Sequence, residues 1–256
     1  MVTTFGDNIS GAFTGGQPVK AIYSKGEKVW PVRDIQTGYT RYDYIHSFMD
    51  SSTTPAAFKI SGIPWGTNSS IEVKVDLQAF SQTFTGNWIL AYSGGSVGWH
   101  PDVAKDIFKV YGDRYSTDKQ IKVAHYENYD AESGTSVVET YVPASDMVIL
   151  KVTPTALYAD GVLVANWPIV TGYSSIILSI FGYWNYQQDA WDFSSSTGSN
   201  EHIYWVKVKS GNALLYKFVP AVRDSDGKKG LWEEVNEQFY IQDSTTYGAL
   251  HVGNDN

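Results

Sequence analysis

The stretch YADGVLVANW, residues 158–167, decides the fold class. An Asp-Gly pair stands there between two runs of apolar residues. This pair is a strong signal of a β-hairpin, because both turn residues need a positive φ, which Gly reaches without steric cost. We therefore predict a hairpin with Asp160 and Gly161 at its tip and with Tyr158, Leu163 and Val164 in its strands.

Four further segments alternate apolar and polar residues with a period of two, as half-buried strands do. SIEVKVDL (70–77) places Ile71, Val73, Val75 and Leu77 on one face. KQIKVAHY (119–126) and MVILKVT (147–153) repeat the pattern. In IYWVKVK (203–209) we expect Tyr204, Val206 and Val208 to face inward, and Trp205, Lys207 and Lys209 to face solvent. One solvated face per strand predicts antiparallel sheets.

Two segments differ from this pattern. HPDVAKDIFKVY (100–111) fits a helix that begins near Pro101 as well as it fits a strand. Residues 1–33 begin with a Gly-, Thr- and Ser-rich lead, and VKAIYSKGEKVWPV (19–32) predicts two short strands around a Lys25-Gly26 turn. The rest of the chain predicts an all-β, antiparallel two-sheet sandwich.

Composition excludes several function classes. The chain has 256 residues, a formal net charge of −8 and a pI near 5.0. We expect no nucleic-acid partner, since phosphate contacts need a basic surface. There is no cysteine, so disulfides and thiolate sites are absent. The longest apolar run, SSIILSIF (174–181), is too short to span a bilayer, and the start of the chain shows no export-signal pattern. We therefore expect neither membrane insertion nor export by a standard signal.

The C-terminal half carries a family resemblance. LYADGVLVANW followed by EHIYWVKVKSGNALLYKFVPAVRDSDGKKGLWEEVNEQFY resembles the concanavalin A-like, laminin-G-like jelly-roll domains of phage and gut-bacterial proteins. The match covers 203–240 well and 150–166 in part. VKAIYSKGEKVWPV is similar to the short segment that precedes such domains in virion proteins of phages that infect gut Bacteroidetes. The end of the chain, TTYGALHVGNDN, departs from the family pattern, so the final strand is either shortened or used for assembly.

The resemblance implies a concanavalin A-like jelly-roll over 34–256, preceded by an attachment hairpin over 1–33. It implies a phage structural protein, namely a head fibre, a decoration protein or a tail appendage. Its partners would be capsid or tail proteins and further copies of the chain, with Ile22, Tyr23, Val29 and Trp30 as candidate assembly residues. The protein would be assembled in the host cytoplasm as part of the virion and be extracellular after lysis.

Jelly-rolls of this superfamily include glycoside hydrolases, which usually carry a Glu-x-Asp-x-(x)-Glu pattern on one strand. The hydrolysis needs two carboxyl groups roughly 5–9.5 Å apart. The nearest candidates are Glu72 with Asp76, Glu127 with Asp130 and Glu132, and Asp189 with Asp192, and none completes the pattern. We therefore predict no enzyme, and Glu72 and Asp76 fit the solvated face of an ordinary strand.

Other reactive sites are also missing. The chain has no Gly-x-Ser-x-Gly motif, and its five histidines lack the i, i+4 spacing of a helical zinc site. DSDG (224–227) lacks the later ligands of a calcium loop and predicts a tight turn. We predict no cofactor and assign no metal, while calcium bound by loop Asp and Asn side chains stays open.

The richest stretch for binding is FGYWNYQQDAWDFSSSTGSN (181–200). Aromatic faces beside amides and carboxylates suit a sugar, which presents an apolar C–H face and hydroxyl groups. The candidate carbohydrate-binding residues are Tyr183, Trp184, Tyr186, Trp191 and Asp192. Alternatively, these aromatics pack against the sandwich or lie at a subunit contact. Trp65 and Trp99 are loop aromatics with weaker surroundings.

The sequence thus favours a non-enzymatic phage structural protein whose jelly-roll contacts host-surface glycans. The alternative is a bacterial carbohydrate-binding module or lectin. A glycoside hydrolase is the third hypothesis.

Overall fold

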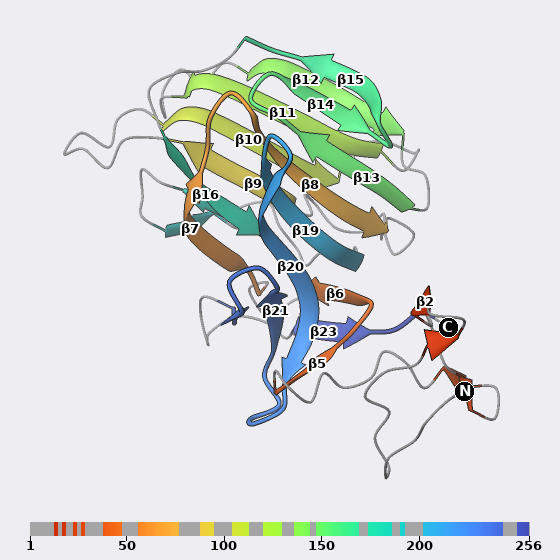
Figure 1. Ribbon diagram of the computed structural model, residues 1–256. Helices are drawn as coiled ribbons and strands as arrows, with labels where there is room; N and C mark the ends of the chain where they lie inside the picture. The colour runs from red at the N-terminus through yellow and green to blue at the C-terminus, as the bar shows by residue number, and fades with distance from the viewer. Residues whose placement is uncertain are drawn as a thin grey trace.

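The computed structural model describes residues 13–14, 17–18, 23–24, 27–28, 38–47, 56–76, 88–94, 104–112, 120–129, 136–143, 147–168, 174–185, 190–192, 202–242 and 250–255. Within these residues the chain is all-β, and the main strands form two antiparallel sheets (Figure 1). No helix in the described part is long and apolar enough to cross a membrane.

Sheet I contains six strands among the described residues, in the spatial order β12-β11-β10-β9-β16-β7. All five of its strand pairs are antiparallel. The bounds are β7 (Phe58–Pro64), β9 (Trp88–Gly94), β10 (Ala104–Gly112), β11 (Gln120–Tyr129), β12 (Ser136–Pro143) and β16 (Ser175–Ile180).

Sheet II has the main order β15-β14-β13-β8-β19-β20-β21-β22, and β5, β6 and β23 pair beside it in the described part of the chain. The central strands are β8 (Ser69–Asp76), β13 (Met147–Val152), β14 (Ala156–Ala159), β15 (Val162–Asn166), β19 (His202–Ser210) and β20 (Ala213–Arg223). The others are β5 (Tyr39–Arg41), β6 (Tyr44–Ser47), β21 (Lys229–Glu233), β22 (Gln238–Tyr240) and β23 (Leu250–Gly253). In Figure 1, β20 runs from the sandwich into this lower group of strands.

The chain crosses repeatedly between the sheets, which is the connectivity of a jelly-roll. It passes from β7 in sheet I to β8 in sheet II, returns to sheet I for β9 to β12, and crosses back for β13 to β15. It then adds β16 to sheet I and β19 to sheet II. The predicted two-sheet, all-β jelly-roll sandwich is confirmed.

The core lies between the sheets because alternate residues of each strand point inward. Sheet II contributes Ile71, Val73, Val75, Val148, Leu150, Val152, Val206 and Val208. Sheet I contributes Ile60, Ile63, Leu90, Phe108, Val110, Leu178 and Ile180. The predicted inward faces of 70–77 and 147–153 are therefore confirmed where the structure describes them.

The predicted Asp-Gly hairpin is formed by β14 and β15. Asp160 has a φ of 48° and Gly161 a φ of 81°, so both turn residues lie in the left-handed region. The Asp160 side chain also binds the neighbouring strand β13, because its Oδ1 accepts the N–H of Ile149 at 2.9 Å. The ambiguous segment at 100–111 contains β10, which pairs with β9 and β11 and is therefore a strand.

Two predictions about aromatic residues are corrected. The register of β19 shifts between Ile203 and Trp205, so Ile203 takes the inward position and Tyr204 is the extra residue of a β-bulge. The Tyr204 ring lies under the Nζ of Lys74, 4.5 Å from its centroid, on the outward side of sheet II. Trp65 lies in the loop that follows β7, as predicted, but it is buried in the core and offers no aromatic face to a ligand.

The ends of the chain also form strands. β3 (Tyr23–Ser24) pairs with β4 (Glu27–Lys28), which confirms the two short strands around Lys25-Gly26. These strands, like β1 (Phe13–Thr14) and β2 (Gln17–Pro18), belong to neither sheet. Near the other end, β23 pairs with β6, so the final strand completes an edge of sheet II. The assembly role of Tyr23 stays a prediction, and Ile22, Val29 and Trp30 lie outside the described residues.

Candidate functional site

The predicted aromatic site begins where β16 leaves sheet I. Phe181 follows β16, is buried, and has a φ of 61°, which bulky residues rarely adopt. Its N–H donates to the C=O of Ile89 on β9 at 3.2 Å. This turn redirects the chain into β17 (Tyr183–Asn185), which lies beside β9 and pairs with β18 (Ala190–Asp192).

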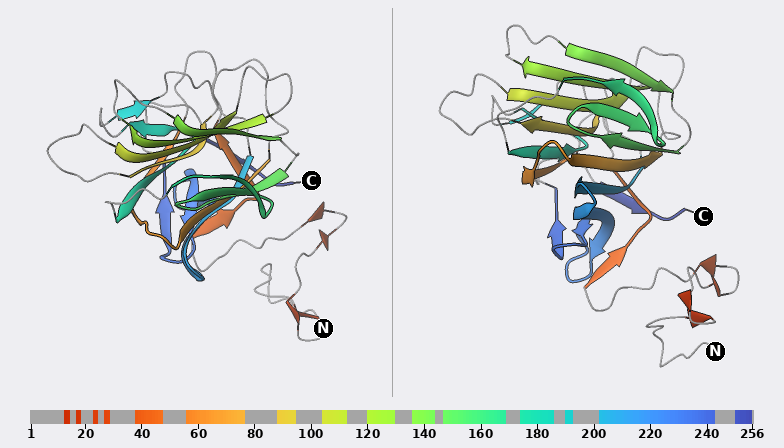
Figure 2. Two further views of the ribbon diagram at one scale, coloured as in Figure 1. Left: turned by 90° about the horizontal axis from the view of Figure 1, so that it is seen from above. Right: turned by 45° about the horizontal axis from the view of Figure 1, so that its top comes forward.

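The β17–β18 hairpin brings four of the five predicted residues together. Its register sets Trp184 opposite Trp191 and Tyr183 opposite Asp192. Figure 2 (left) shows the hairpin on the side of sheet I that faces away from sheet II. Tyr186 lies outside the described residues.

Of the candidate carboxylate pairs, only Glu72 and Asp76 both have described side chains, and they stand four residues apart on β8. Both oxygens of Glu72 accept from Lys209 Nζ at 2.9 Å, on the outward face of β8. This confirms the solvated-face interpretation of that strand. Glu127 lies on β11 and Asp192 on β18, whereas Asp130, Glu132 and Asp189 lie outside the described residues.

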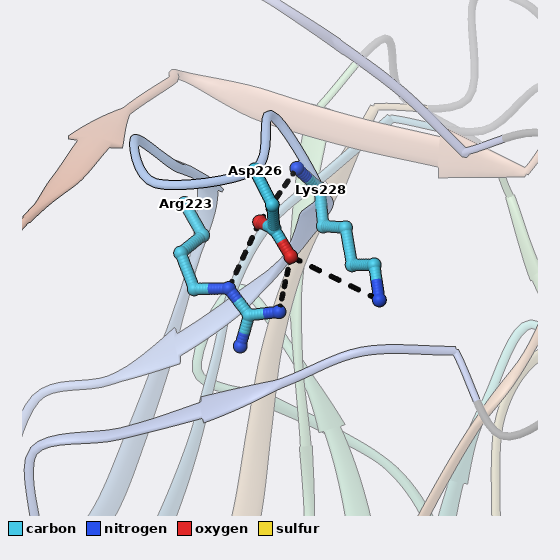
Figure 3. Close-up of polar contacts among 3 residues, drawn as sticks. All are labelled: Arg223, Asp226 and Lys228. Atoms are coloured by element: carbon cyan, nitrogen blue, oxygen red, sulfur yellow. Dashed lines mark hydrogen bonds and ion pairs between the residues drawn. The ribbon is translucent and has the colours of Figure 1, made fainter.

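The DSDG segment is a tight turn closed by an ion pair (Figure 3). Asp226 Oδ1 accepts from Arg223 Nε at 2.9 Å, and Asp226 Oδ2 accepts from Arg223 Nη2 at 2.5 Å. Asp226 Oδ1 also accepts the backbone N–H of Lys228 at 3.2 Å, and Gly227 has a φ of 68°. The guanidinium hydrogen bond lowers the pKa of Asp226 to about 2. The carboxylate is therefore engaged within the turn.

Three histidines meet at the outward side of β6, β19 and β23. The ring centroid of His46 lies 5.1 Å from that of His251 and 5.3 Å from that of His202, and Tyr44 stacks on His202 at 3.7 Å. Burial, together with charge repulsion from His202, His251 and Lys229, lowers the pKa of His46 to about 4. Burial also lowers the pKa values of His202 and His251. The cluster is therefore uncharged at neutral pH.

Sequence spacing does not reveal this histidine cluster, because its members come from strands far apart in the chain. His46 and His251 are direct partners in the β6–β23 ladder, and β19 pairs with the other edge of β6. In the part of the chain that the structure describes, no group of three or more His, Cys, Asp or Glu residues is arranged to hold a metal ion.

No family model and no curated protein matches this chain. Among solved structures, it is similar to the heptameric SAP-like pentraxin from Limulus polyphemus, with 12% identity and a TM-score of 0.47 over 83% of this chain and 95% of that one. It is also similar to a glycoside hydrolase family 16 endo-glucanase from Bacteroides ovatus, with 10% identity and a TM-score of 0.42 over 65% and 80% of the two chains. The galectin LEC-6 from Caenorhabditis elegans shows 8% identity and a TM-score of 0.33 over 64% and 95%. These weak similarities assign no activity, ligand or assembly to this chain and do not connect it with virion proteins.

Proposed function

We propose that this chain is a non-enzymatic jelly-roll that contacts a glycan through its β17–β18 hairpin. The observation that carries the proposal is the register of that hairpin, which sets Trp184 opposite Trp191. Paired aromatic residues offer an apolar platform to a sugar ring.

The conformation of Phe181 supports a functional rather than an incidental hairpin. A buried aromatic residue at a φ of 61° costs free energy, and such a conformation persists only where contacts with the surrounding structure hold it in place. Here the turn keeps β17 beside β9 and on the outer side of sheet I. The platform is therefore fixed to a strand of the sandwich.

A glycan array with the full chain tests this proposal. On an array of uncharged glycans, the Trp184→Ala variant should lose the signal of any glycan that the full chain binds, whereas Trp205→Ala, which removes an outward tryptophan of sheet II, should keep it. Equal binding by the full chain and Trp184→Ala would refute a site on the hairpin. The non-enzymatic part is tested by incubation with the bound polysaccharide, and turnover that Asp192→Asn abolishes would make the chain a hydrolase.

We further propose that the domain is displayed as a capsid or tail appendage of a phage particle. The resemblance over 203–240 and the hairpin β3–β4 outside both sheets support this role. Display in many copies would make a weak glycan site effective, because linked copies raise avidity without new contacts. The alternative is a bacterial lectin, which would act without virion partners.

Two measurements separate these alternatives. Light scattering should show an oligomer for the full chain and a monomer for a variant with Ile22→Asp and Trp30→Ala, if the N-terminal hairpin drives assembly. Mass spectrometry of purified particles from a phage that encodes the chain should detect it as a virion component. A monomeric full chain that is absent from particles would favour the lectin.

A further inference from the structure

A second surface with binding chemistry lies on the outward face of sheet II. The register aligns outward residues of four neighbouring strands in one row: Tyr158 on β14 opposite Lys151 on β13, Lys151 opposite Glu72 on β8, and Glu72 opposite Lys207 on β19. Their strand neighbours are core residues, so this row faces away from sheet I. The surface is thus on the opposite side of the sandwich from the β17–β18 hairpin.

This row borders a depression of about 350 Å³, here named the Trp205 pocket. Its lining includes Glu72, Ile149, Lys151, Tyr158, Trp205 and Lys207. The volume falls in the range of small-molecule sites, roughly 300–1,000 Å³. The Asp160-Gly161 turn contributes Gly161 to its rim, so the hairpin that defines the fold also shapes this surface.

The side chains that line the pocket carry a net positive charge, although the whole chain has a net charge of −8. Glu72 is neutralised by Lys209, which donates to both of its oxygens at 2.9 Å. Lys207 Nζ lies 3.9 Å from the ring centroid of Trp205, and Lys151 Nζ lies 6.0 Å from that of Tyr158. Neither Lys151 nor Lys207 forms an ion pair with a described residue. Burial lowers the pKa of Lys207, which shows that its ammonium group is partly withdrawn from water.

These groups select a ligand that carries both an anionic group and hydroxyl groups. A carboxylate or sulfate would form charge-assisted hydrogen bonds with the two ammonium groups. The carboxylate of Glu72, whose charge Lys209 balances, accepts from hydroxyl donors, and Ile149 and Trp205 offer apolar contact to a sugar ring.

We propose that the Trp205 pocket binds an acidic saccharide, with Lys151 and Lys207 on its carboxylate or sulfate and Trp205 beside its ring. This site uses none of the residues of the β17–β18 hairpin and does not depend on that hairpin binding a glycan.

Calorimetric titration of the full chain tests the proposal, with an oligogalacturonate for the carboxylate and a sulfated dextran oligomer for the sulfate. The methyl-esterified oligogalacturonate and plain dextran are the uncharged controls. At least one acidic probe should bind, and its uncharged counterpart should bind at least about tenfold more weakly, because hydrogen bonds to charged groups are the stronger ones. The probe that binds identifies the anionic group.

Four variants localise the binding. Lys151→Gln and Lys207→Gln should each weaken the Kd about tenfold. The matched control is Lys74→Gln on β8. Lys74 carries the same charge on the same outward face of sheet II, but it does not line the pocket. The control should keep the wild-type affinity, and so should Trp184→Ala on the hairpin.

Two results would overturn the proposal. One is the absence of binding to both acidic probes. The other is an equal loss in Lys74→Gln and the two pocket variants, which would reveal unspecific attraction to the charged face. Thermal unfolding of each variant checks that the fold is intact.

Discussion

Replacement of Glu233 by Gln should destabilise the protein strongly, although the two side chains have almost the same shape. Glu233 is fully buried at the end of β21, and its carboxylate accepts four hydrogen bonds. Oε1 accepts the backbone N–H groups of Lys217 and Val235 at 2.8 and 2.9 Å. Oε2 accepts the N–H and the side-chain Nδ2 of Asn236 at 2.7 and 2.8 Å. The carboxylate thus holds the β21–β22 turn against β20.

In Glu233→Gln an NH₂ group replaces one carboxylate oxygen. This NH₂ group cannot accept the two hydrogen bonds that the oxygen accepted, and its own hydrogens would face the two N–H donors. Two charge-assisted hydrogen bonds are lost at about 1.5 kcal/mol each, so we expect the free energy of unfolding to fall by about 3 kcal/mol. Urea denaturation followed by tryptophan fluorescence measures this, with an unchanged m-value as the condition for comparison.

The neighbouring Glu234 provides the matched control for this prediction. It forms ion pairs with Arg41 at 2.9 Å and Lys217 at 2.6 Å, and both partners are partly exposed. Glu234→Gln should therefore cost less than about 1 kcal/mol. If Glu233→Gln costs no more than Glu234→Gln, the hydrogen bonds of Glu233 do not stabilise the turn and the reasoning is wrong.

Three further predictions concern stability. The pKa of His46 is lowered from 6.5 to about 4, so the unfolded chain binds more protons and stability falls as pH drops from 6.5 towards 4. After a discount for partial exposure, His46 should contribute a loss of about 1–2 kcal/mol between pH 7.5 and pH 5. Denaturation at both pH values should show a smaller loss in His46→Phe, where only the lowered pKa values of His202 and His251 remain. Gly230→Ala should cost about 2–3 kcal/mol in the same assay, because its Cβ would collide with the carbonyl oxygen of Tyr240. Asp160→Ala should lower the free energy of unfolding by about 1 kcal/mol through the lost bond to Ile149 N–H, and an unchanged midpoint would contradict this.

The sequence predicts those parts of the fold that depend on local information. The alternation in 70–77 sets which side chains enter the core, because a one-residue slip of a strand would turn its apolar residues to solvent. The Asp160-Gly161 pair sets the turn for a similarly local reason. The segment at 100–111 stays ambiguous in sequence because its alternation is incomplete, and pairing with β9 and β11 decides that it is a strand.

The candidate site was only partly predictable. The β17–β18 hairpin lies within one short stretch, so the aromatic residues could be found by composition, but their register could not. The Trp205 pocket combines residues from β8, β13, β14 and β19. The sequence predicts that Trp205 and Lys207 face solvent together, whereas the approach of Lys151 requires the strand order β13-β8-β19.

One local irregularity explains both the misplaced Tyr204 and the unexpected histidine cluster. A strict period of two would point Tyr204 into the core, and Ile203 would face solvent. The bulge lets Ile203 turn inward opposite Ile45 of β6, while the hydroxyl of Tyr204 donates to Asp255 at 2.9 Å. A buried tyrosine needs such a partner for its O–H, so the bulge satisfies the core and the hydroxyl together. It also reverses the direction of His202, which then faces outward opposite Asp76 and stacks on Tyr44. Without this extra residue, His202 would point into the core and the histidine cluster could not form.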